Sequence, residues 1–269
     1  MVKKLIKHEL IYYSRNLLLA EVIIIAFGFL NRFIQLFEND TDVYSTLFST
    51  SLVTLVIGCF LCPLFALILS VIRFYRNFYA SEGYLTFTLP VTVNQHLIAK
   101  IITAFVAQFS AILTILIALA AASMGDLLNE VVKAIIFLIK ELYNNIGNQI
   151  WLYTFEILLL ISVFTVSGFL FYFCCISLGQ RSKRNRILAA VLIYFGFNVV
   201  SQFIASFVSL GVSLAAMNID FTWFSDLLKT HPYTTTHIIL LIITLLAASW
   251  VALMYFIIHR NTSKKLNLE

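Results

Sequence analysis

Long runs of hydrophobic residues, separated by short polar segments, form the main pattern of this sequence. Five segments contain no Asp, Glu, Lys or Arg: 43–72, 101–125, 157–180, 187–219 and 238–258. A helix that crosses a bilayer needs about 20 mostly apolar residues, so each of these segments is long enough. Residues 16–37 form a sixth candidate, in which we expect Glu21 and Arg32 to lie near the ends, where long side chains reach the interface.

The pattern predicts an all-α integral membrane protein that forms a single transmembrane domain, 1–269. The expected spans are 16–37, 43–72, 101–125, 151–180, 187–219 and 237–259. Composition agrees, because 61% of the residues are hydrophobic and only 12% are charged, whereas roughly a quarter are charged in a soluble domain. The first span is not followed by a small-residue cleavage site, so we expect it to be retained and not removed as a signal peptide.

Basic residues are unequally divided between the two sides that six spans would define. Fourteen of the 18 Lys and Arg residues fall on the side of the N-terminus. The other side receives Arg32, Lys133, Lys140 and Lys229. Cytoplasmic segments are enriched in Lys and Arg, so we expect both termini in the cytoplasm and the chain in the cell membrane. No basic and aromatic groove indicates nucleic-acid binding.

Two segments outside the spans have the pattern of amphipathic helices. In 2–15, apolar residues recur on one helical face and the lysines lie off it, which is typical of a helix along the inner membrane surface. The alternative is a charged flank that only orients the first span. In 127–141, an apolar stripe runs past Lys133 and Lys140. This second segment lies on the outer surface or extends a neighbouring helix outward.

Few residues in the spans are suited to catalysis. All five histidines lie in flanks or loops, and the sequence has no HExxH, GxSxG or phosphate-binding GxxxxGK[ST] motif. Cys59 and Cys62 have the spacing of a redox or metal motif, but they lie in an apolar span with no nearby His or carboxylate. For these and for Cys174 and Cys175 we expect packing, with neither a disulfide nor a metal. We therefore expect no catalytic residues, no cofactor bound by this chain and no enzyme activity of its own.

Small and polar residues mark possible contact faces within the spans. Small side chains recur at every fourth position in two places: Ser110, Thr114, Ala118, Ala122, and Ser201, Ala205, Ser209, Ser213. Such stripes let helices approach closely in lipid, either within one chain, at a subunit interface or along the wall of a pathway. Glu156, at the outer end of its span, is a functional candidate by default, although an interfacial position with access to water explains it nearly as well.

One polar segment, SEGYLTFTLPVTVNQHLIAK at 81–100, separates the second and third spans within an expected cytoplasmic loop, 73–100. Gly83 can close the preceding helix, Pro90 favours extended geometry before it, and TVNQ at 92–95 has the form of a capping box. Four large side chains lie between the two breaks: Tyr84, Leu85, Phe87 and Leu89. Exposed to the cytoplasm, they would need a membrane surface or a protein to cover them.

This segment resembles the loop between the second and third spans of ABC-2 type transporter permeases. The residues that carry the resemblance are Glu82, Gly83, Leu85, Leu89, Pro90, Val91 and Lys100. The N-terminal amphipathic helix and the six spans resemble the type V exporter-like transmembrane domain of the same family, in which this loop docks on an ATPase subunit. One departure is that Gly83 follows Glu82 directly, whereas many members have residues between them.

The resemblance implies roles for two groups of residues. The elements that couple the chain to the ATPase would be Glu82, Gly83, Tyr84, Leu85, Phe87, Leu89 and Pro90. A second cytoplasmic contact would be made by Arg181, Lys183, Arg184 and Arg186. The subunit interface or the path would include the stripe from Ser201 to Ser213.

The function implied is that of a permease subunit in an ATP-driven exporter. Its partners would be a second permease subunit, in a homodimer or heterodimer, two ATPase subunits that carry ATP and Mg, and membrane lipid. Similar permeases export lantibiotics, other amphipathic peptides and drugs, so we expect a hydrophobic or amphipathic cargo such as an antimicrobial peptide or toxin. An ion-gradient-driven transporter is an alternative that needs charged residues near the middle of the bilayer, where neither Glu21 nor Glu156 is expected. The other alternative is a membrane scaffold or sensor that does not transport.

Overall fold

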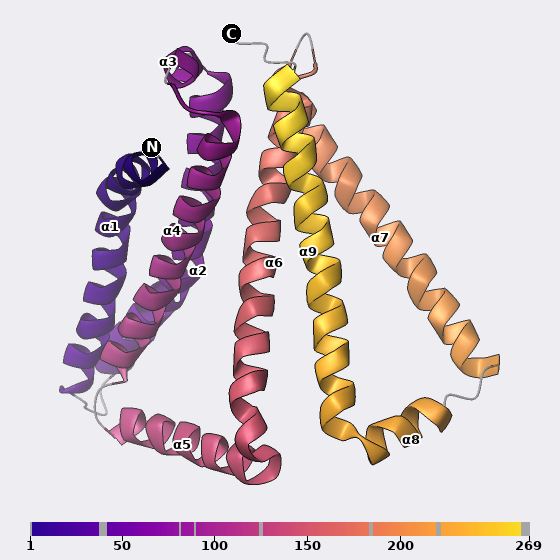
Figure 1. Ribbon diagram of the computed structural model, residues 1–269. Helices are drawn as coiled ribbons and strands as arrows, with labels where there is room; N and C mark the ends of the chain where they lie inside the picture. Colours follow the sequence, from indigo (N-terminus) through magenta and orange to yellow (C-terminus); the bar gives the residue numbers. More distant parts are fainter. Residues whose placement is uncertain are drawn as a thin grey trace. The chain divides into compact units, whose positions relative to one another are not determined.

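The structure is a computed structural model that describes residues 2–37, 42–80, 82–88, 90–123, 126–182, 185–218 and 222–264. Within these ranges the chain forms helices and no strands (Figure 1). The helices are α1 (Val2–Gln35), α2 (Asp42–Tyr79), α3 (Glu82–Thr88), α4 (Val93–Ala122), α5 (Asp126–Ile146), the short 3₁₀-helix η1 (Gly147–Gln149), α6 (Ile150–Gly179), α7 (Arg186–Asn218), α8 (Thr222–Thr230) and α9 (Pro232–Lys264).

Six of the described helices are long and apolar enough to cross a membrane: α1, α2, α4, α6 with η1, α7 and α9. This confirms the predicted all-helical fold with six helices that are long and apolar enough to span a membrane. The segment 2–15 joins the first span without a break in α1, and the first turns of α1 bend away from the rest of the helix (Figure 1). Helix α2 continues to Tyr79, so it includes the first residues of the expected loop 73–100.

Contacts divide the chain into two units. The first contains Met1–Phe74 and Leu89–Ile150, and the second contains Tyr75–Thr88 and Trp151–Glu269. In the first unit, α1, α2 and α4 share a core of apolar side chains. Its buried members are Tyr13, Leu17 and Ile24 from α1, Leu55, Cys62, Ala66 and Leu69 from α2, and Ala107, Ala111 and Ala118 from α4.

Small residues bring α1 and α4 into backbone contact. A Cβ atom added at Gly28 would collide with the backbone of Ala118, and Gln35 Nε2 donates a hydrogen bond to the Ala122 carbonyl at 3.3 Å. Without a hydrophobic driving force between helices in lipid, such close approach is a main source of helix association. The stripe on α4 that includes Thr114 and Ala118 is therefore used for packing within the chain.

Aromatic side chains and one close backbone contact join α6, α7 and α9 in the second unit. The rings of Phe171 and Tyr172 on α6 lie 5.7 Å and 5.6 Å from Tyr194 on α7, and Phe197 on α7 lies 5.8 Å from Trp250 on α9. A Cβ atom at Gly179 would lie 2.7 Å from the backbone nitrogen of Ala190, so only glycine fits there. The end of α6 and the start of α7 are therefore in close backbone contact.

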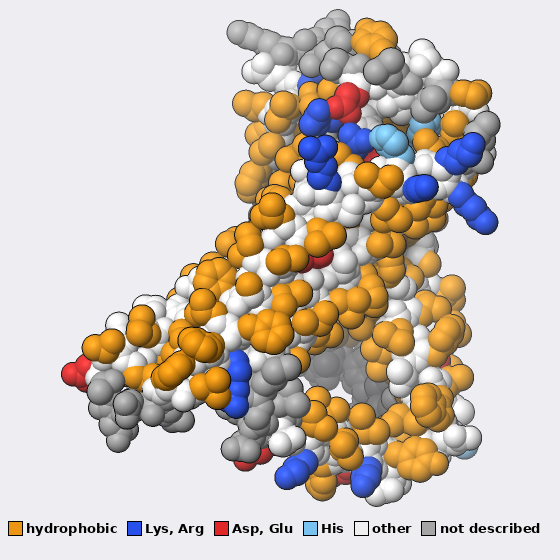
Figure 2. Space-filling view, turned by 90° about the vertical axis from the view of Figure 1, so that its left-hand side faces the viewer, with side chains coloured by type: hydrophobic (Ala, Val, Ile, Leu, Met, Phe, Trp, Pro, Cys, Tyr) orange, Lys and Arg blue, Asp and Glu red, His pale blue; other side chains and the backbone are white. Residues whose placement is uncertain are grey.

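Most of the apolar surface of the long helices stays exposed, as expected for helices in contact with lipid. In the face shown in Figure 2, hydrophobic side chains cover most of the visible surface of the helices, and many of the Lys and Arg side chains gather near one end. Helix α5 runs across the end of α4, and the short α8 runs across the end of α9 (Figure 1). Both crosswise helices are amphipathic in sequence, which suits a position in the membrane interface.

Candidate functional site

The polar segment between α2 and α4 forms a short helix and a capped helix start. Helix α2 ends at Tyr79, and the Gly83 amide donates to the Ala80 carbonyl at 2.8 Å as α3 begins. At the start of α4, Thr92 has extended backbone geometry and its amide donates to Gln95 Oε1 at 3.3 Å. This is the reciprocal contact that the TVNQ pattern predicts.

The structure places part of the expected coupling element. Glu82 is in the first turn of α3 and forms an ion pair with Arg76 from the end of α2. Tyr84 is exposed, whereas Gly83 is buried and Pro90 is exposed. The side chains of Leu85 and Phe87, and Leu89 as a whole, lie outside the described residues, so their expected exposure stays a prediction.

Three charged side chains converge where this segment ends, in the first turns of α4. Lys100 Nζ lies 2.7 Å from Glu9 Oε2, and Arg73 Nε lies 3.2 Å from the same oxygen. Their side chains are only 4%, 8% and 11% exposed for Lys100, Glu9 and Arg73. The three residues come from α4, α1 and α2, so one buried carboxylate ties three long helices together.

An aromatic ring completes this cluster, which we name the Glu9 clamp: Glu9, Tyr12, Arg73 and Lys100. The Arg73 guanidinium lies 4.2 Å from the centre of the Tyr12 ring, a cation–π distance that favours the charged group in a partly desolvated site. Glu9 is the carboxylate that both cations contact. Neutralising it would leave two buried cations without this anion, which is strongly destabilising.

Sequence reasoning identified Lys100 as part of a resemblance and Arg73 as an orienting charge, but it did not identify Glu9. A signal existed, because Glu9, Tyr13 and Leu17 are spaced four residues apart and are all buried on the same face of α1. A carboxylate on the apolar face of a basic helix needs a partner. The identity of that partner depends on the packing of α1 against α2 and α4.

Glu156 belongs to a separate cluster that joins α6 to α9. Its Oε2 lies 2.8 Å from His237 Nδ1, and both side chains are about one-fifth exposed. The His237 ring stacks on Tyr153 with 4.1 Å between centroids, and the Tyr153 hydroxyl also contacts the Thr236 hydroxyl. Glu156 is therefore a tether between two helix ends, which gives it a structural role beyond access to water.

The remaining candidates are dispersed. Arg181 Nη2 donates to Asn261 Oδ1 at 2.8 Å and Arg186 is the first residue of α7, whereas Lys183 and Arg184 lie outside the described residues. The stripe on α7 is exposed along its whole length in the single chain: Ser201, Ala205, Ser209 and Ser213. All four cysteines are free thiols, and only Cys59 is not fully buried.

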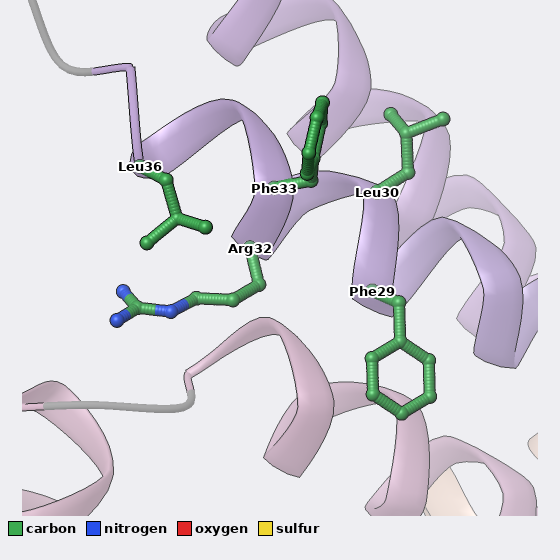
Figure 3. A pocket seen from close by; sticks show the side chains of 5 residues that line it. All are labelled: Phe29, Leu30, Arg32, Phe33 and Leu36. Atoms are coloured by element: carbon green, nitrogen blue, oxygen red, sulfur yellow. The ribbon is translucent and has the colours of Figure 1, made fainter.

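An open, mostly apolar hollow of about 460 Å³ lies at the far end of α1 from the Glu9 clamp. It is lined by Phe29, Leu30, Arg32, Phe33 and Leu36. Phe29 and Arg32 extend towards the neighbouring ribbon, and Leu30 and Phe33 point the other way (Figure 3). Arg32 also donates to Gln35 Oε1 at 3.2 Å. An arginine among apolar side chains near a helix end is the arrangement expected at a membrane interface.

Comparisons with known proteins give no match to any family model, curated protein or solved structure. Support for a function therefore comes from two sources, the pattern of the 81–100 segment and the contacts that hold it. The Glu9 clamp is the most constrained of these contacts, because it unites three helices through buried charges.

Proposed function

We propose that this chain is the permease subunit of an ATP-driven exporter of the ABC-2 type. The observation that carries the proposal is the junction of the 81–100 segment with the spans. Its last residue, Lys100, is held in the Glu9 clamp, while its first helix, α3, is joined to the end of α2 by the Arg76–Glu82 pair. A segment that contacts the long helices at both of its ends can transmit a push from an ATPase to them.

The clamp determines which helices would move together. Because Glu9 contacts both Lys100 and Arg73, a displacement of the base of α4 is passed to α1 and α2 without a flexible step. The close contact between Gly28 and Ala118 extends this rigid body along α1 and α4. ATP binding by a separate ATPase subunit would thus shift three helices as one body.

A second permease subunit would complete the path. Helix α7 is long, apolar and largely exposed in the single chain, and its small-residue stripe allows a close helix approach. Two such faces would pair in a homodimer, or one would pair with a related chain. A hydrophobic or amphipathic cargo, such as an antimicrobial peptide, suits a path lined by these helices.

The test is removal of the apolar anchors that we assign to the ATPase contact, with Phe87→Ala and Leu89→Ala combined. Anchors of this kind can each cost about 2 kcal/mol or more when truncated, so the double variant should lose co-purification with the ATPase encoded nearest to this gene. Thr88→Ala, between the two sites and exposed, is the matched control and should co-purify normally. Normal binding and normal transport-coupled ATP hydrolysis by the double variant would exclude this segment as the coupling element.

A further inference from the structure

The exposed side of the first turns of α1 is basic. Lys4, Lys7, Ile11 and Arg15 recur at steps of three or four residues, so they lie on one face of the helix. The three cations are exposed, and Ile11 between them is 56% exposed. We name this surface the basic face of α1, and Lys3, also exposed, lies at its edge.

The opposite side of the same turns is fixed by packing. Glu9, Tyr13 and Leu17 are buried there, and the Glu9 carboxylate contacts both Lys100 and Arg73. These contacts determine that the basic face points away from α2 and α4. Part of the apolar side of this amphipathic segment is therefore used within the protein, and the cations are what the helix presents outward.

The basic face carries positive charge that no described acid of the chain neutralises. Within the residues that the structure describes, its three cations form no ion pair. On the side of the membrane where the sequence places them, the carboxyl side chains are Glu9, Glu82 and Glu269. Glu9 and Glu82 already pair with other cations, and Glu269 lies outside the described residues. The charge on this face thus favours an anionic partner.

An exposed apolar stripe on α1 continues the basic face along the same side of the helix. After Arg15, the positions at helical spacing include Leu18, Val22 and Phe29, whose exposed fractions are 52%, 54% and 51%. Helix α1 is long and apolar enough to cross a membrane, so this stripe is suited to contact with lipid chains. Cations that follow such a stripe where the apolar run ends are suited to contact with lipid headgroups.

The phosphate groups of anionic phospholipids match the chemistry of this face. Lysine binds phosphate as a point charge, and arginine binds it through two parallel N–H donors. A basic cluster beside a membrane span attracts anionic lipids, with roughly a five-fold gain in affinity for each cation. Ile11, exposed between the cations, suits the boundary between headgroups and acyl chains. A zwitterionic lipid carries its own cation next to the phosphate and therefore gains less from this surface.

We propose that the basic face of α1 binds the phosphate groups of anionic phospholipids at the membrane surface. The lipids supply the negative charge that this face lacks. A ligand that binds only the folded chain stabilises it, and Glu9 lies on the other side of the same helix turns. Bound lipids therefore stabilise the start of α1 in the arrangement of the Glu9 clamp. The surface would act in this way in a permease, an ion-driven transporter or a scaffold, so it does not depend on the function proposed above.

The test is thermal unfolding of the full-length chain in detergent micelles with increasing phosphatidylglycerol or, separately, phosphatidylcholine. Phosphatidylglycerol should raise the midpoint temperature of unfolding more than phosphatidylcholine does at the same mole fraction. Combining Lys4→Gln, Lys7→Gln and Arg15→Gln should raise the half-saturating phosphatidylglycerol concentration roughly 100-fold, because each cation contributes roughly five-fold. Sodium chloride at about 1 M shortens the Debye length to about 3 Å, so it should weaken the effect of phosphatidylglycerol on the wild type.

Two control variants separate the basic face from charge in general and from folding. Lys133→Gln, Lys140→Gln and Lys229→Gln combined remove three exposed cations elsewhere, and this variant should respond to phosphatidylglycerol as the wild type does. Lys4→Arg with Lys7→Arg keeps the charge of the basic face and should also respond fully. Without added lipid, every variant should unfold near the wild-type midpoint temperature, because the substituted side chains are exposed.

Three outcomes would overturn this assignment. They are equal effects of the two lipids on the wild type, an equal loss of response in the Lys133, Lys140 and Lys229 control, and full competition by millimolar inorganic phosphate, which would assign the face to a soluble anion. Loss of ATPase co-purification by the Lys4, Lys7 and Arg15 variant, without any difference between the lipids, would assign the face to a protein contact instead. No ATPase is present in the unfolding measurement, so its outcome is independent of the ATP-driven mechanism.

Discussion

Glu9→Gln is the most informative single substitution in the Glu9 clamp. It keeps the size of the side chain and removes the negative charge that lies 2.7 Å from Lys100 Nζ and 3.2 Å from Arg73 Nε. Arg73 and Lys100 would then both lose the carboxylate that they contact. Breaking a buried ion pair on one side typically costs about 3–5 kcal/mol, and we expect a loss of that order in the free energy of unfolding.

Lys100→Met should reduce the free energy of unfolding less than Glu9→Gln does, because Glu9 keeps its contact with Arg73. The double variant Glu9→Gln with Lys100→Met should be more stable than Glu9→Gln alone, since it removes one of the two buried cations that lose the Glu9 carboxylate. A double-mutant cycle isolates the coupling energy between Glu9 and Lys100. The free energies of unfolding for this cycle would be measured by equilibrium unfolding in detergent, followed by circular dichroism.

Arg76→Gln is the control for the Glu9 clamp, because Arg76 also pairs with a glutamate but its side chain is 51% exposed. An exposed pair is worth about 0–1 kcal/mol, so this variant should unfold nearly as the wild type does. If Glu9→Gln is no more destabilising than Arg76→Gln, the carboxylate does not join the three helices, and the rigid-body movement proposed for α1, α2 and α4 loses its basis.

Three further predictions address packing, topology and assembly. Gly28→Val should destabilise the chain by about 1–3 kcal/mol through overpacking against α4, whereas Gly168→Ala, with open space around it, should not; thermal unfolding compares them. A membrane-impermeant thiol reagent should label Asp226→Cys in intact cells but not Ser263→Cys, and the reverse would invert the orientation. Ser209→Phe, on the exposed stripe of α7, should reduce dimer content in cross-linking with unchanged unfolding; an unaltered dimer would place this face against lipid.

Local pattern was sufficient to predict some features of the fold. Apolar length predicted the six long helices, and TVNQ predicted the contact between Thr92 and Gln95, because both depend on residues close in sequence. The partners of Glu9 could not be predicted in this way, since Lys100 lies 91 residues further along the chain and meets Glu9 only through helix packing.

The start of the first long helix was also beyond the sequence pattern. Helix α1 extends back to Val2, so the amphipathic segment 2–15 and the predicted span from residue 16 form one helix. The buried contacts of Glu9 with Arg73 and Lys100 depend on the packing of this helix against α2 and α4.

The Glu9 clamp also has a consequence for the order of biosynthesis. Glu9 is made first, Arg73 follows near the end of α2, and Lys100 follows only in the first turns of α4. At a synthesis rate of about 5–20 residues per second, roughly 5–20 s pass between Glu9 and Lys100. Until Arg73 has been made, neither of the two cations that contact the Glu9 carboxylate in the structure is present. Synthesis of the first turns of α4 is thus the event that would commit the first three long helices of the nascent chain to their final arrangement.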